Sequence, residues 1–136
     1  MKKLMLGLVF ALAAAVSIGV LSAGAVTSNK AVSVNLNEFN VLPAVQGAPA
    51  GPVTFTVKNS GKIEHEFVVL RTLRSAGGLM DKSGEANEAG NVGEIGSVKP
   101  GQQKKLTLTL KKGHYSLLCN LPAHYKSGQF VDFYVR

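Results

Sequence analysis

The sequence has few of the residues that commonly stabilise or charge a small domain. It contains one cysteine, Cys119, among 136 residues, so it can form no internal disulfide bond. Acidic residues are also few, with 8 Asp and Glu against 15 Lys and Arg, and the formal net charge is +7. The basic residues are scattered and form no cluster with aromatic residues, which disfavours nucleic acid binding. The charge itself indicates at most a weak preference for acidic partners or anionic surfaces.

The N-terminal segment has no charged residue between Leu4 and Asn29 and is rich in Ala, Leu and Val. Two lysines precede this run and Ala23-Gly24-Ala25 follows its most apolar part, which is the pattern of a secretory signal. We expect cleavage after Ala25, which leaves residues 26–136 as one secreted or periplasmic domain. The alternative is an uncleaved membrane anchor, because the run is long enough to span a bilayer. In an oxidising compartment, a lone thiol must be buried or bound to escape oxidation.

The remaining chain lacks a strong helical pattern and any internal repeat. Residues alternate between apolar and polar in several runs, which is typical of strands with one buried face. The expected strands and their inward residues are 32–37 (Val32, Val34, Leu36), 52–58 (Val53, Phe55, Val57), 63–71, 104–110 (Leu106, Leu108, Leu110), 114–119 and 130–135. Residues 39–45 continue the apolar pattern after the first of these. About seven strands in this arrangement indicate an all-β sandwich.

The segment between Thr72 and Gly101 is glycine-rich and irregular. We expect it to be a functional loop or a covering flap, because long loops inside compact domains usually have one of these roles. Ser83 to Ala89 could form a short helical turn. Met80 is expected to fill a gap in the apolar interior.

The most informative stretch runs from Cys119 to Gln129. It places a thiol, the imidazole of His124 and an amide oxygen at intervals of five residues, between two expected strands. A hairpin loop of this kind can bring three ligands around one small ion. A buried and inert Cys119 is the simpler alternative, since free cysteines are often buried.

A fourth ligand must come from the same end of the sandwich, and the candidates are His65, His114 and Met80. His114 lies five residues before Cys119 in one expected strand, so alternation directs it to the opposite face. His65 begins a hydrophobic strand, where a polar ring is hard to explain as packing, and is the better candidate. Two imidazoles, one thiolate and a weak axial donor suit copper in electron transfer, whereas structural zinc more often has four strong ligands.

At these residues the sequence resembles the cupredoxins, the family of small blue copper proteins that includes plastocyanin and azurin. The resemblance rests on His65-Glu66-Phe67 after Asn59-Ser60-Gly61, and on the stretch from Gly113 to Gln129. It implies a Greek-key β-sandwich of seven to eight strands with one type 1 copper bound by His65, Cys119 and His124.

The sequence departs from most cupredoxins at two positions. Gln129 stands where most members have an axial Met, which is similar to the stellacyanins; alternatively, Gln129 faces solvent and the copper has three ligands. Ala123 stands where many relatives have Gly, which should be tolerated unless the backbone there needs a positive φ. Asn59 and Asn120 are expected to fix the surrounding loops and to tune the thiolate by hydrogen bonds.

The expected function is one-electron transfer between exported redox proteins by a monomer that is not an enzyme. Partners would dock near His124 over a small apolar surface, with Lys126 at the rim steering an acidic partner. A copper carrier or storage protein is the alternative, although the exposed Met or His clusters common in such proteins are absent. A thiol enzyme with Cys119 as nucleophile and His124 as base is a third possibility, but no acidic residue stands out to orient the base.

Overall fold

A computed structural model describes residues 29–136, and the expected signal with its cleavage after Ala25 lies outside this part of the chain. The described residues form strands β1 (Lys30–Asn37), β2 (Asn40–Pro43), β3 (Gly47–Ala48), β4 (Gly51–Asn59), β5 (His65–Arg71), β6 (Asn91–Val98), β7 (Gln103–Leu110), β8 (Gly113–Leu118) and β9 (Phe130–Val135), and a single 3₁₀ turn, η1 (Ala76–Gly78). In this part of the chain no helix is long and apolar enough to cross a membrane.

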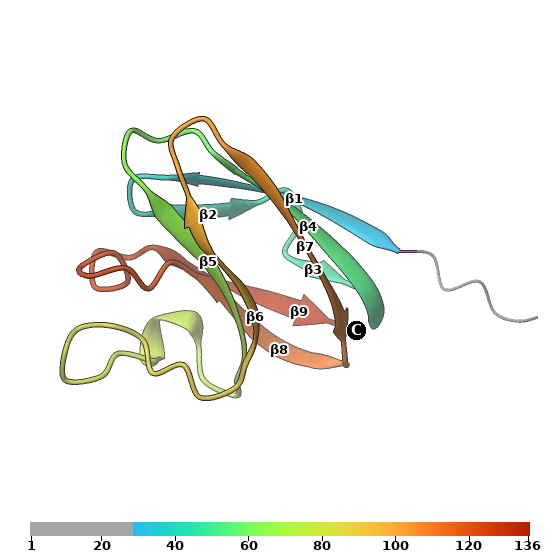
Figure 1. The fold of residues 1–136 in the computed structure, drawn as a ribbon. Helices are drawn as coiled ribbons and strands as arrows, with labels where there is room; N and C mark the ends of the chain where they lie inside the picture. The colour runs from blue at the N-terminus through green and yellow to red at the C-terminus, as the bar shows by residue number, and fades with distance from the viewer. Residues whose placement is uncertain (1–28) are drawn as a thin grey trace, which may run out of the picture.

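The strands form two packed sheets, which confirms the all-β sandwich (Figure 1). One sheet has the order β2-β1-β4-β7 and the other β3-β9-β8-β5-β6. The β1–β4 and β3–β9 pairs are parallel and the other pairs are antiparallel. The nine strands slightly exceed the expected number, because β2 and β3 are short and β6 was not predicted.

The main core lies between the two sheets and contains the residues that alternation directed inward. Val34, Phe55 and Leu117 are among the side chains with almost no exposed surface there. Leu106 and Leu108 pack against the same core from β7 and are partly buried. Period-two alternation therefore identified the inner face of each regular strand correctly.

A second apolar cluster covers the outer face of β5 and β8. It contains Val68, Leu70, Leu79, Ala86, Leu118 and Tyr125, so the segment after β5 packs on this face as a flap. This explains why Phe67 to Leu70 are all buried rather than alternating.

The segment from Thr72 to Gly101 is more ordered than the sequence indicated, and three expectations about it were wrong. Its second half is strand β6, whose Gly93 lies so close to Leu108 that an added Cβ would stand 2.5 Å from that side chain. Ser83 to Ala89 form no helical turn, and Ala86 instead makes an isolated bridge to Met80. Met80 is 49% exposed and does not fill a core gap, because the flap turns it outward.

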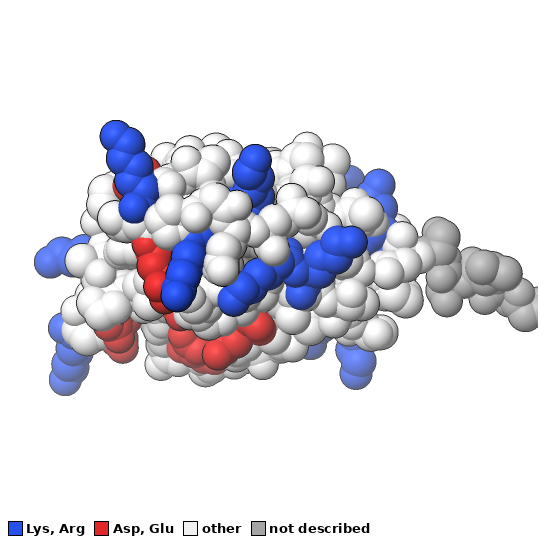
Figure 2. All heavy atoms as spheres, turned by 45° about the horizontal axis from the view of Figure 1, so that its top comes forward, with Lys and Arg blue, Asp and Glu red and all other residues white. Residues whose placement is uncertain are grey.

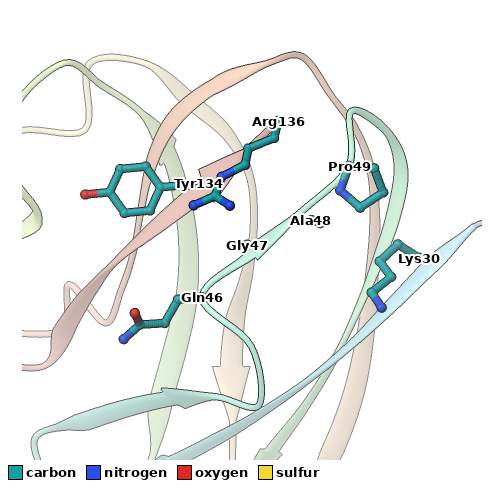
Figure 3. Close-up of a pocket in the computed structure, with 7 residues that line it drawn as sticks. All are labelled: Lys30, Gln46, Gly47, Ala48, Pro49, Tyr134 and Arg136. Atoms are coloured by element: carbon teal, nitrogen blue, oxygen red, sulfur yellow. The ribbon is translucent and has the colours of Figure 1, made fainter.

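The two ends of the sandwich differ in content. The loop from Cys119 to Gln129 and the β1–β2 turn lie at one end, whereas the start of β1 and the C-terminus lie at the other (Figure 1). A groove of about 620 Å³ occupies this second end, lined by Lys30, Gln46, Gly47, Ala48, Pro49, Tyr134 and Arg136 (Figure 3). It contains none of the candidate ligands, so the candidate site is at the first end.

Candidate metal centre

Two strands bring the candidate ligands together. β5 begins at His65, and β8 runs antiparallel to it and leads directly into Cys119. The pairing of Val68 with Leu118 aligns the start of β5 with the end of β8 at one end of the sandwich. The following loop then returns His124 to the same place.

The three side chains point their ligand atoms at one another. The Sγ of Cys119 lies 3.2 Å from Nδ1 of His124 and 4.0 Å from Nδ1 of His65, and the two Nδ1 atoms are 3.3 Å apart. All three ligand atoms lie within 4.8 Å of one another. Cys119 and His65 are buried and His124 is half-buried. One small ion could contact all three atoms, and soft sulfur with two imidazoles suits copper.

The environment of Cys119 favours the protonated thiol when no metal is bound. Burial raises its pKa, and hydrogen bonds from the N–H groups of Glu66 and Leu121 only partly offset this effect. The Glu66 N–H lies 3.4 Å from Sγ. Because a metal ligand must be a thiolate, metal binding would have to release this proton. A buried thiol with a raised pKa is also a poor nucleophile, which argues against the thiol-enzyme alternative.

Gln129 is fully buried, so the alternative in which it faces solvent is wrong. Its Nε2 donates to the carbonyl of Asn37 at 2.9 Å and lies 3.1 Å from Nδ1 of His65. This hydrogen bond fixes the orientation of the amide, and Oε1 is left buried with no hydrogen-bond partner. An unpaired buried carbonyl oxygen is costly, and a metal ion is one group that could satisfy it. His65, Cys119 and His124 therefore fit one copper ion, and the Gln129 amide is buried beside them.

The loop itself is held by its own backbone. The N–H of Cys119 donates to the carbonyl of Gln129 at 3.0 Å, and the N–H of His124 donates to that of Leu121 at 2.9 Å. Ala123 has a φ of 69°, which is the left-handed region that disfavours residues with a Cβ. The condition under which Ala123 would be strained is therefore met.

Asn59 and Asn120 each fix a loop beside the site, as expected. Asn59 is buried and donates to the carbonyls of Ile63 and Val98, both at 2.7 Å, which holds the turn before His65. Asn120 accepts from the N–H of Ala86 at 2.6 Å and so joins the ligand loop to the flap. The N–H that donates to the thiol from outside the ligand loop belongs to the backbone of Glu66 and not to either asparagine side chain.

His114 lies away from the site, as strand alternation predicted. Its Nδ1 is 2.9 Å from the carbonyl of Thr72, and its Nε2 is 2.8 Å from Asp132. His114 is half-buried, and the Thr72 carbonyl that contacts its ring belongs to the segment after β5.

Carboxylates gather beside the ligand loop. Burial raises the pKa of Glu66, and the nearby Glu88, Glu94 and Glu85 raise it further. Figure 2 shows acidic side chains in several groups on the face it views, with basic side chains between and around them. The glutamates around Glu66 therefore form a local acidic group on a basic protein.

Sequence reasoning missed the β1–β2 turn, which contacts three of the four candidate ligands. Its carbonyls hold Gln129, Glu38 faces His65, and Phe39 packs against His124. The turn contains no His or Cys and follows a polar strand end, so only the fold reveals its place beside the candidate ligands.

Comparison with known proteins agrees with this geometry. A family model described as a cupredoxin-like domain matches residues 8–131. No curated protein sequence matches the chain.

Three solved structures illustrate the shared fold. Reduced auracyanin from Roseiflexus castenholzii is similar with a TM-score of 0.63 and 20% identity, over 80% of this chain and 98% of that one. Auracyanin A from Chloroflexus aurantiacus, described as a blue copper protein, has a TM-score of 0.58 and 17% identity over 78% and 99%. Rusticyanin from Thiobacillus ferrooxidans has a TM-score of 0.58 and 20% identity over 80% and 79%. The group of His65, Cys119 and His124 is positioned to bind one copper ion.

Proposed function

Because the chain belongs to the cupredoxin-like family, we propose that it is an exported type 1 copper protein that carries single electrons between redox partners. The observation that carries this proposal is the convergence of two imidazole Nδ1 atoms and one buried thiol at the end of the sandwich. His65, Cys119 and His124 would hold the metal, with Gln129 as a weak fourth donor. Copper bound there supplies a couple between Cu(I) and Cu(II) that both soft sulfur and imidazole tolerate.

The protein contributes a rigid set of donors. Cys119 is tied by its own N–H and by the Glu66 N–H, and His65 is the first residue of a paired strand. Donors fixed by the fold change position little between two oxidation states, which favours rapid electron transfer. The arrangement supports a carrier of electrons rather than an enzyme.

His124 is the ligand that reaches the surface. It is half-buried, and exposed Pro122, Ala123 and Phe39 lie near it in the chain or in contact with its ring. An apolar rim suits brief docking, and transient redox complexes bury less than about 1,200 Å². The carboxylates near Asn120 and the exposed Lys126 give the wider rim both signs of charge.

Export is the other part of the proposal. The uncharged run before Lys30 and its Ala-Gly-Ala end support a cleaved signal. The N-terminal residue of the exported protein distinguishes cleavage after Ala25 from an uncleaved anchor.

The decisive test is the absorption of the purified protein loaded with Cu(II). We expect an intense thiolate-to-copper charge-transfer band that a mild reductant removes and an oxidant restores. Cys119→Ser should abolish the band, because the thiolate is its source. His114→Asn is the matched control and should retain it, because His114 lies away from the ligands.

Three outcomes would contradict electron transfer by this site. A colourless Cu(II) complex, or a Cys119→Ser protein that keeps the band, would exclude thiolate ligation. A coloured protein that cannot be cycled between the two states would favour the copper carrier.

A further inference from the structure

The β1–β2 turn, residues 37–40, supplies no ligand but surrounds the candidate ligands on one side. Its backbone carbonyls hold Gln129, its Glu38 carboxylate faces His65, and its Phe39 ring contacts His124. A short turn that touches three of four ligands can set their positions. Such outer contacts orient ligands and tune a bound metal.

The contact with His65 is the most specific of these. His65 directs Nδ1 toward Cys119 and His124, so its Nε2 faces away from them. This Nε2 is buried and has no hydrogen-bond partner, and the Glu38 Oε1 lies 4.0 Å from it. When Nδ1 of a neutral imidazole binds a metal, Nε2 must carry the proton. The buried Nε2 of His65 therefore has a carboxylate oxygen as a neighbour, 4.0 Å away.

Glu38 is held in place by two backbone donors. Its Oε1 accepts hydrogen bonds from the N–H groups of Lys62 and Ile63, in the loop that precedes β5. These two bonds hold the Oε1 atom of the carboxylate beside His65. Its position is consequently fixed on both sides, by its own turn and by the loop leading to His65.

The backbone of the turn is strained at Phe39. Its φ is 65°, a region that bulky residues rarely occupy. The ring is 43% exposed and meets the His124 ring edge-on, with centroids 5.9 Å apart and planes at 88°. Backbone strain of this kind persists where the surrounding structure imposes it, and it occurs often at functional sites.

We propose that Glu38 is a positioning residue for the metal centre, whose carboxylate attracts the Nε2–H of His65. This interaction holds the ring with Nδ1 toward the metal and makes Nδ1 a stronger donor, which favours Cu(II) over Cu(I). The inference rests on the proposed function, because it requires His65 to be a ligand.

The test compares Glu38→Gln with the native chain. Glutamine keeps an oxygen that can accept from Lys62 and Ile63 but removes the negative charge. We expect the affinity for Cu(II) to fall about tenfold, which is the lower end for loss of a carboxylate partner, and the reduction potential to rise. Glu64→Gln is the matched control, because Glu64 is an exposed neighbour of His65, and both quantities should stay close to native.

Unfolding of the copper-free proteins separates positioning from loop support. If Glu38 only supports the loop, Glu38→Gln would destabilise the copper-free protein without changing the potential, and the proposal would be wrong. An unchanged Cu(II) affinity would overturn it as well. If the native chain gives no charge-transfer band at all, the proposed function fails instead.

If Glu38→Gln does not fold, the protonation state of His65 in the native chain tests the proposal instead. In the Cu(I) protein, which is diamagnetic, nitrogen NMR should show His65 with a protonated Nε2 that exchanges slowly with water. An Nε2 without a proton would contradict the proposed contact with Glu38.

Discussion

The ligand loop, residues 119–129, and the β1–β2 turn meet at the metal centre but contribute different things. The loop contains three of the candidate donors, Cys119, His124 and Gln129. The turn supplies no candidate metal donor and instead contacts the donors from outside. The loop is recognisable from residue type and spacing, whereas the turn is recognisable only from its place in the fold.

The two segments therefore affect different aspects of a metal site: which metal it selects, and the affinity and potential of that metal. Soft and imidazole donors select the metal, and contacts behind the donors adjust its affinity and potential. Both segments contain a residue with a Cβ in the left-handed region, Ala123 in the loop and Phe39 in the turn. The fold imposes strain on both sides of the site.

Gln129 joins the two segments, and Gln129→Met should have the largest effect. A thioether is a softer donor than an amide oxygen, so the reduction potential should rise if Gln129 is the axial donor. The Asn37 carbonyl would also lose its donor, which should destabilise the copper-free protein by about 1–2 kcal/mol. Electrochemistry and urea unfolding measure the two effects.

Gln103→Met provides the control, because Gln103 is exposed on β7. It should change neither quantity appreciably. An unchanged or lower potential in Gln129→Met would show that the fourth donor is not this side chain, and the loop would then supply only two ligands.

The ligand loop and the β1–β2 turn shift the pKa of His65 in opposite directions. Burial lowers this pKa from 6.5, the charge of His124 in the loop lowers it further, and Glu38 in the turn acts in the opposite direction. Because the folded pKa is below the unfolded one, the unfolded copper-free chain binds the proton more readily. His65 therefore contributes stability above pH 6.5 that is lost as the pH falls toward its folded pKa.

The prediction is checked by unfolding copper-free protein at several pH values between about 7.5 and 5.5, where a histidine of ordinary pKa titrates. The stability advantage of the native chain over His65→Gln should shrink as the pH falls. The comparison with this variant removes the opposite contribution of Glu66, whose raised pKa stabilises the fold at low pH. A difference that grows toward acid would mean that Glu38 outweighs burial.

The smallest effect is expected from relieving the left-handed backbone strain in the two segments. Ala123→Gly should stabilise the copper-free protein by about 0.5–1 kcal/mol, since relief of left-handed strain exceeds the added freedom of the unfolded chain. Phe39→Gly should give no such gain, because it also removes the ring that packs on His124. Ala44→Gly, at an exposed position without a positive φ, should be slightly destabilising. A loss of stability in Ala123→Gly would mean that the strain is absent in solution.

The regular part of the fold could be predicted because its strands alternate. Val53, Phe55 and Val57 share one face and all are buried in the main core. Strand β6 could not be predicted in the same way, because Gly93 and Gly96 interrupt its pattern and its burial depends on contact with β7. Met80 was misplaced because apolar character alone does not distinguish a core residue from one on an exposed flap.

The site was predictable where residue chemistry was distinctive. His65, Cys119 and His124 converge as their types and strand positions indicated. The surroundings were not predictable, because Glu38 and Phe39 are ordinary surface residue types until the β1–β2 turn is placed beside the loop. The backbone N–H of Glu66 at the thiol has no signature in the sequence at all.

The antiparallel pairing of β5 with β8 has a consequence for the unfolded chain. It unites two candidate ligands, His65 and Cys119, that are 54 positions apart in the sequence. An ion held by both would act as a crosslink, and closing a loop of this length restricts the unfolded chain by about 4 kcal/mol in the chain-entropy model of disulfides. A protein with one cysteine could thus obtain from metal binding the kind of stabilisation that small secreted domains obtain from a disulfide bond.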